Sequence, residues 1–199
     1  MTDLHNTADV TFFFDPVCPW TWRASRWLAE VAGRRGLQVD WAPLSLYVVN
    51  EDHLSDQFRS SLEVSLRALR LVAALRAEGR HADNGRLYAE LGGLVHDGGA
   101  DATESVLHQA AERAGASGAL GALDDASWDA EVRRATEEAV ASAGPDVGSP
   151  VLAMPTASRG LHGPIMGSVP TGEQADGLWA AVVTLLEAPD FFELKRGRR

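Results

Sequence analysis

The stretch Val10–Thr21, VTFFFDPVCPWT, decides the fold of this chain. Its first part, Val10–Phe14, is a run of β-branched and aromatic residues, which is typical of a buried strand. A helical pattern begins at Pro19, and proline suits the first position of a helix because the N–H it lacks would have no partner there. Between the two parts lies Cys18, the only cysteine in 199 residues. The pattern predicts a strand that leads directly into a helix, with a single thiol at the junction.

A thiol at the start of a helix is well placed to react as the thiolate. Unpaired backbone N–H groups and the helix dipole stabilise an anion there. The alternative is a buried, inert thiol, because free cysteine is among the most buried residue types. Thr21 stands where a Cys-x-x-Cys motif has its second cysteine. Disulfide exchange at Cys18 would therefore need a second thiol from outside the chain, and we expect the Thr21 hydroxyl to point at the Cys18 sulfur.

The rest of the chain divides into three segments. The first helix extends to about Ala32 and is followed by a strand over Leu37–Leu44, so the order β-α-β predicts a parallel pair. Residues 51–145 carry apolar residues at helical spacing and show no strand pattern. After Asp146 the strand pattern returns.

Two short strands are predicted in this last segment, over Pro150–Met154 and Leu161–Ile165. The turn-like residues between them indicate a hairpin, and a helix from about Thr171 follows. The whole order predicts an α/β fold. We expect one domain of residues 1–50 and 146–199, interrupted by an all-helical domain of residues 51–145.

Composition limits the function. The net charge of −10, from 28 acidic and 18 basic residues, argues against a nucleic-acid partner. No stretch reaches the ~20 apolar residues that span a membrane, and the N-terminus lacks the features of a signal peptide. We therefore expect a cytoplasmic protein without a membrane partner. The histidines show no metal-ligand spacing, and no glycine-rich nucleotide motif occurs, so we expect no metal and no tightly bound cofactor.

Several motifs together resemble a known family. They are Phe14-Asp15-Pro16-x-Cys18-Pro19-Trp20, Ser45-Leu46, Asn50-Glu51, Val147-Gly148-Ser149-Pro150, Gly163-Pro164 and Phe191-Phe192-Glu193-Leu194-Lys195-Arg196. With the order of elements, they resemble the DsbA-like thioredoxin-fold family, and within it the actinobacterial mycothiol-dependent nitroreductase group. The resemblance implies a thioredoxin-like fold with an inserted helical domain. Thr21 departs from the Cys-Pro-Trp-Cys motif of that group, so a dithiol mechanism does not carry over.

The resemblance also implies a set of site residues. Pro150 would be the cis-proline that lies against the sulfur of Cys18, and the Ser149 backbone would pair with a bound thiol substrate. The substrate side would be formed by Pro19, Trp20, Asn50, Phe58 and His96. At Phe58 the group resembled has a tyrosine, so a phenolic hydrogen bond would be missing.

Each substrate-side residue also has a plainer interpretation. Trp20 could simply pack at the surface or at a domain interface. Asn50 could serve a turn, a common role of asparagine. His96 could be a solvated histidine at a helix end.

Three functions remain open at this level. The first is a thiol-disulfide oxidoreductase, in which Cys18 reacts by a monothiol mechanism with mycothiol or a similar small thiol and reduces a nitroaromatic-like electrophile or a mixed disulfide. The second is an isomerase or transferase, in which Thr21 stabilises the thiolate of a bound thiol cofactor. The third is a non-catalytic binding domain. The sequence leaves the oligomeric state open, including a homodimer.

Overall fold

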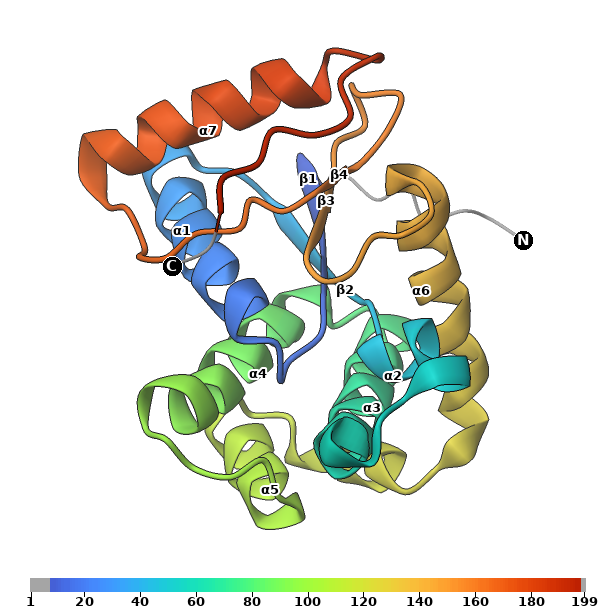
Figure 1. Ribbon diagram of the computed structural model, residues 1–199. Helices are drawn as coiled ribbons and strands as arrows, with labels where there is room; N and C mark the ends of the chain where they lie inside the picture. Colours follow the sequence, from blue (N-terminus) through green and yellow to red (C-terminus); the bar gives the residue numbers. More distant parts are fainter. Residues whose placement is uncertain (1–7, 198–199) are drawn as a thin grey trace.

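The computed structural model describes residues 8–197 (Figure 1). Residues Met1–His5, from which we inferred that the N-terminus lacks the features of a signal peptide, lie outside this range. Four strands form one sheet: β1 (Val10–Phe14), β2 (Val39–Pro43), β3 (Val151–Ala153) and β4 (Leu161–His162). Their order is β2-β1-β3-β4. β1 and β2 are parallel, whereas β1–β3 and β3–β4 are antiparallel, so the predicted parallel pair and the predicted hairpin are both confirmed.

The last two strands are shorter than their apolar runs suggest. Prolines limit them, because Pro150 precedes β3, Pro164 follows β4, and neither has an N–H group to donate to the ladder. The last hydrogen bond at this end of the β3–β4 pair runs from the Gly163 amide to the carbonyl of Pro150 at 2.9 Å. The apolar residues beyond this short ladder, Met154 and Ile165, are half-buried outside the strands.

Seven α-helices lie within the described range. They are α1 (Pro19–Arg35), α2 (Leu46–Val49), α3 (Asp56–Ala77), α4 (His81–Gly92), α5 (Glu104–Arg113), α6 (Asp129–Ala143) and α7 (Gly172–Leu186). Short turns η1 (Glu51–His53), η2 (Gly93–Asp97), η3 (Ser117–Leu123) and η4 (Ala126–Trp128) connect them, and η2 is a π-helical turn. Helix α1 continues past the expected end near Ala32 and stops at Gly36, whose φ of 70° suits glycine.

Alternation along the strands gives the sheet two apolar faces. Phe12, Phe14 and Trp41 belong to a large core cluster that also takes in side chains of α1, α3, α4, α5 and α7. Phe13 and Ala42 point the other way, into a smaller cluster that includes Ala139 of α6. In Figure 1 the sheet accordingly lies between α1 with α7 and α6.

The helices between β2 and β3 extend this core instead of building a separate one. The ring of Phe14 on β1 stacks on Tyr88 of α4 with centroids 4.2 Å apart, and Trp41 contacts the same tyrosine edge-on. The fold is therefore thioredoxin-like with a helical insertion whose apolar side chains join the core of the sheet. In the described range, no helix has both the length and the apolar character needed to cross a membrane.

Candidate active site

Cys18 lies at the junction of β1 and α1, as the N-cap residue of the helix. Its backbone is held on both sides: its amide donates to the Asp15 carbonyl at 3.2 Å, and its carbonyl accepts from the Trp22 amide at 3.0 Å. The side chain is largely buried, and its sulfur lies 3.7 Å from the carbonyl oxygen of Ser149. The thiol is therefore fixed between the start of α1 and the residue that precedes Pro150.

The peptide bond between Ser149 and Pro150 is cis. The Ser149 hydroxyl oxygen accepts two hydrogen bonds, one from the amide of Asp15 and one from the hydroxyl of Thr21, each at 2.8 Å. The Thr21 hydroxyl is buried and donates to Ser149, not to the Cys18 sulfur toward which we expected it to point. These bonds join the β1–α1 junction to the residue pair before β3, and they link residues 128 and 134 positions apart in the sequence.

Asp15 is a fully buried carboxyl group beside this junction. Its Oδ1 accepts hydrogen bonds from the Val17 amide at 3.0 Å and the Ser65 hydroxyl at 2.6 Å, and its Oδ2 accepts from the Leu46 amide at 2.8 Å. Burial raises the pKa of Asp15 to about 6, although these three hydrogen bonds lower it. One side chain thus links the turn before Cys18 to α2 and α3.

His96 approaches the same turn from the helical insertion. It lies in the π-helical turn η2, and such turns are frequent at functional sites. Its Nε2 donates to the Pro16 carbonyl at 2.9 Å, and its ring stacks on Trp22 with centroids 5.7 Å apart. Burial is the main cause that lowers the pKa of His96. The half-buried ring is therefore part of the wall behind Cys18 and not a solvated helix-end histidine.

The other expected substrate-side residues are more exposed to solvent than Cys18. Pro19 is exposed and Trp20 half-exposed at the start of α1. Asn50 is exposed, ends α2, and donates its side-chain amide to the Leu46 carbonyl at 2.7 Å, which is the turn role left open above. Phe58 on α3 is 56% exposed. Among residues 8–197, neither Asn50 nor Phe58 has a hydrogen bond or ring contact with the Cys18 motif.

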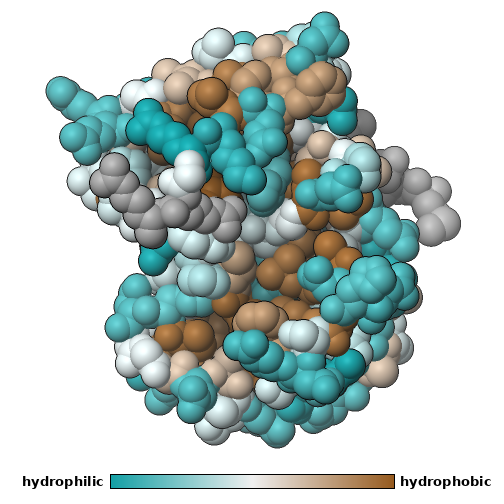
Figure 2. All heavy atoms as spheres, viewed as in Figure 1, coloured by the Kyte–Doolittle hydropathy of each residue, from teal (hydrophilic) through white to brown (hydrophobic). Residues whose placement is uncertain are grey.

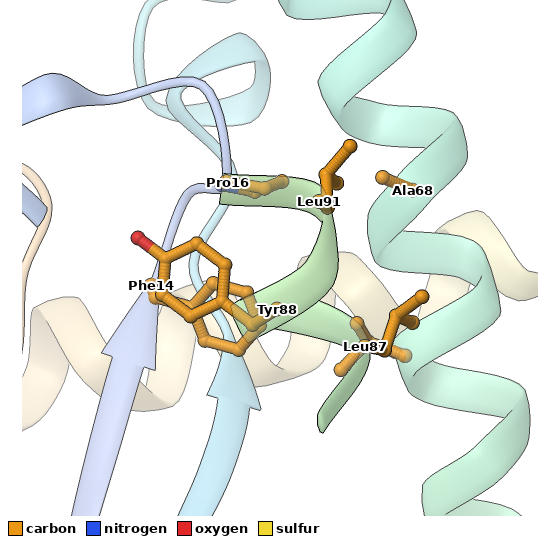
Figure 3. Close-up of a pocket in the computed structure, with 7 residues that line it drawn as sticks. Phe14, Pro16, Ala68, Leu87, Tyr88 and Leu91 are labelled. Atoms are coloured by element: carbon orange, nitrogen blue, oxygen red, sulfur yellow. The ribbon is translucent and has the colours of Figure 1, made fainter. Parts of the chain in front are cut away.

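Tyr88 is a buried residue of the site that the sequence interpretation missed. Its ring lines a small apolar cavity with Phe14, Pro16, Ala68, Val72, Leu87 and Leu91 (Figure 3). Its hydroxyl points past Phe14 and away from Leu87; it lies near the Ser25 hydroxyl but makes no hydrogen bond of ordinary geometry within the described chain. Burial raises the pKa of Tyr88 well above its usual value, so the phenol stays protonated.

Asp15 was also missed as a site residue, although a signal was present. An acidic residue directly after a fully apolar strand is a candidate for a buried, hydrogen-bonded carboxylate. Tyr88 gave no comparable signal, because an aromatic residue at helical spacing is ordinary core. In Figure 2, hydrophobic side chains reach the surface between the α1–α7 part and the α3–α5 part.

Solved structures share this architecture. A 2-hydroxychromene-2-carboxylate isomerase superposes with a TM-score of 0.57 at 16% sequence identity, covering 88% of this chain and 94% of the isomerase. The cytosolic disulfide reductase DsbM of Pseudomonas aeruginosa gives a TM-score of 0.54 at 16% identity, covering 88% of this chain and 98% of DsbM. At this identity the likeness shows the fold alone, which is that of the DsbA-like thioredoxin proteins.

Sequence comparisons add the family. The chain is 28% identical over 194 residues to the uncharacterized protein Rv2286c of Mycobacterium tuberculosis (strain ATCC 25618 / H37Rv), covering 94% of this chain and 81% of that protein. The family model described as "Rv2466c-like: Mycothiol-dependent nitroreductase Rv2466c" matches residues 17–196, which include Cys18, Thr21, His96 and Ser149. The chain therefore belongs to the Rv2466c-like family of mycothiol-dependent nitroreductases.

Proposed function

We propose that this protein is a mycothiol-dependent oxidoreductase in which Cys18 is the only nucleophile, and that its acceptors are small electrophiles of the nitroaromatic kind or mixed disulfides. The observation that carries the proposal is the position of the one thiol of the chain: it caps the N-terminus of α1, 3.7 Å from the Ser149 carbonyl. Family membership supports mycothiol as the thiol co-substrate. The cytoplasmic location and the homodimer stay predictions.

With a disulfide acceptor, the proposed reaction uses one equivalent of an external thiol. The Cys18 thiolate attacks a disulfide, forms a bond to one of its sulfurs and releases the other as a thiolate. A second thiolate then attacks the mixed disulfide on Cys18, which restores the Cys18 thiolate and releases a new disulfide. For a nitroaromatic acceptor the balance is one nitro group and two thiols giving one nitroso group, one disulfide and one water.

The monothiol route follows from the surroundings of Thr21. In a Cys-x-x-Cys motif the second cysteine would resolve the mixed disulfide within the chain. Here that position holds a buried hydroxyl, which donates to Ser149 at 2.8 Å. Resolution therefore has to come from solution, through the half-exposed surface near Trp20.

The isomerase alternative needs the Thr21 hydroxyl to face a bound thiolate. Its burial and its hydrogen bond to Ser149 count against that role. The non-catalytic alternative needs an unreactive Cys18. The position of Cys18 at the N-terminus of α1 favours reactivity instead.

Turnover with mycothiol and a nitroaromatic acceptor tests the proposal. We expect consumption of two thiols per nitro group reduced to nitroso, no activity above the uncatalysed rate for Cys18→Ser, and retained activity for Thr21→Val. An isomerase that depends on Thr21 would give the reverse pattern for the two variants. A folded wild-type protein that accelerates neither thiol oxidation nor nitro reduction would contradict the proposal.

A further inference from the structure

Most of the arginines among residues 8–197 form ion pairs with carboxylates. On α3 and α6 they meet carboxylates: Arg70 bonds Asp129 at 2.6 Å, and Arg134 bonds Glu131 at 2.6 Å. Arg23 and Arg26 on α1 form no ion pair with any described residue, although the chain carries 28 acidic residues. Their guanidinium groups lie instead over tryptophan rings, Arg23 over Trp20 at 5.0 Å and Arg26 over Trp22 at 4.2 Å.

Both cations lie on the helix that Cys18 caps. Trp20 is two residues after Cys18 and Arg23 is one turn further along the same helix. Burial lowers the pKa of His96, and the positive charge of Arg23 lowers it too, which places Arg23 near the ring that bonds the Pro16 carbonyl. Arg23 therefore lies near His96, whose ring bonds the turn before Cys18.

Arg23 is the better placed of the two to bind a ligand. Arg26 already donates its Nε to the Ser25 hydroxyl at 3.3 Å. Arg23 is half-exposed, and its stacking on Trp20 uses the flat face of the guanidinium, which leaves the N–H groups at its edge without a partner among residues 8–197. A guanidinium edge with free N–H donors matches a carboxylate in geometry and charge.

We propose that Arg23, held over Trp20, binds the carboxylate of an acidic aromatic substrate that reacts at Cys18. The inference deepens the proposed function and rests on Cys18 being the nucleophile. Trp20 holds the guanidinium in place, and Arg23 offers the charge. In a protein with a net charge of −10, a local cation is what an anionic substrate needs in order to approach.

Two disulfide reagents test this directly, since Cys18 is the only thiol that can react. Dithiobis(nitrobenzoate) carries a carboxylate on each ring, whereas dithiodipyridine is uncharged at neutral pH. With both, the Cys18 thiolate forms a mixed disulfide and releases one aromatic thiolate, whose absorbance gives the rate. The ratio of the two rates separates recognition of the anion from the reactivity of the sulfur.

We expect Arg23→Gln to slow the carboxylate reagent about 5- to 10-fold at low ionic strength while the neutral reagent changes less than about twofold. Arg23→Lys keeps the charge and should recover most of the rate. Arg196→Gln is the matched control, because Arg196 is exposed in the C-terminal segment and has no ion pair in the described chain. In about 0.5 M salt the difference between wild type and Arg23→Gln should shrink.

Equal slowing of both reagents by Arg23→Gln would overturn the inference, because it would mean a general effect on the sulfur or the fold. An equal loss in Arg196→Gln would overturn it too, since the effect would then be one of net charge. Failure of the proposed function has a separate signature: no turnover with mycothiol, while the preference for the carboxylate reagent still depends on Arg23.

Discussion

The candidate active site has a floor and a rim that differ in how they are held. The floor consists of Asp15, Thr21 and Ser149, which are buried and hydrogen-bonded to one another or to neighbouring backbone. The rim consists of Trp20, Arg23, Asn50 and Phe58, which are exposed or half-exposed. The floor therefore belongs to the folded core, whereas the rim is free to vary.

This difference separates two tasks of the site. The floor fixes the Cys18 sulfur relative to the Ser149 carbonyl, so any change there affects every substrate and the stability of the fold. Under the proposed function, the rim would meet the part of the substrate that does not react. Substitutions there should change which substrate is used and leave the fold intact.

The largest effect on stability is expected from Ser149→Ala. The hydroxyl of Thr21 and the amide of Asp15 would both lose their acceptor, and unpaired buried donors destabilise the folded state. We expect a decrease of about 2 to 4 kcal/mol in the free energy of unfolding, measured by urea denaturation. Thr21→Val is the control, because it removes one donor and leaves Ser149 bonded to Asp15, for a loss of about 1 kcal/mol. Equal stability of the two variants would show that the floor is not a network.

The pH dependence of stability should report Asp15. Its pKa is raised by burial from 3.8 to about 6, so between these values the folded chain keeps a proton that the unfolded chain loses. The contribution of Asp15 to the free energy of unfolding therefore falls by about 3 kcal/mol as the pH rises from about 4 to about 6. Asp15→Asn should lack this decrease, whereas Asp56→Asn, at a fully exposed carboxylate, should keep it. Parallel profiles for wild type and Asp15→Asn would contradict the assignment.

Tyr88→Phe should change stability in the opposite direction. The tyrosine hydroxyl is buried and makes no hydrogen bond of ordinary geometry, with only the Ser25 hydroxyl nearby, and phenylalanine keeps the stacking on Phe14 while removing the desolvated group. We expect the variant to be more stable by up to about 1 kcal/mol in urea denaturation. A clear loss of stability would mean that the hydroxyl has a partner in solution, for example a bound water.

The smallest effect on stability is expected at the rim. Phe58 is 56% exposed, so Phe58→Ala should change the free energy of unfolding by no more than about 0.5 kcal/mol. If the ring contacts the acceptor, KM for a nitroaromatic should rise while the rate of disulfide exchange at Cys18 stays the same. A stability loss as large as that of Ser149→Ala would remove the distinction between floor and rim.

Local sequence patterns predicted the framework well. The β-branched and aromatic composition of Val10–Phe14 indicated β1, the proline at Pro19 indicated the start of α1, and both lie where expected. The helical spacing between residues 51 and 145 predicted the insertion. These features depend on neighbours within a few residues, which is why the sequence contains them.

The site was less accessible from the sequence. Cys18 at the N-cap follows from local pattern, but Ser149 and Pro150 entered only through the family resemblance. The Thr21 hydroxyl was assigned to Cys18 because the two are three residues apart, whereas its acceptor is 128 positions away. The partners of Asp15, the place of Tyr88 and the bond from His96 to Pro16 arise from tertiary packing, although the position of Asp15 directly after the strand was a local signal.

The central claim is that Cys18 alone carries the chemistry through a mixed disulfide with an external thiol. Intact-mass measurement of the folded protein, mixed with mycothiol disulfide, tests it most directly. We predict one mycothiol added per chain, removed again by excess thiol and absent in Cys18→Ser. A folded protein that forms no adduct, while the same chain in denaturant does, would contradict the claim.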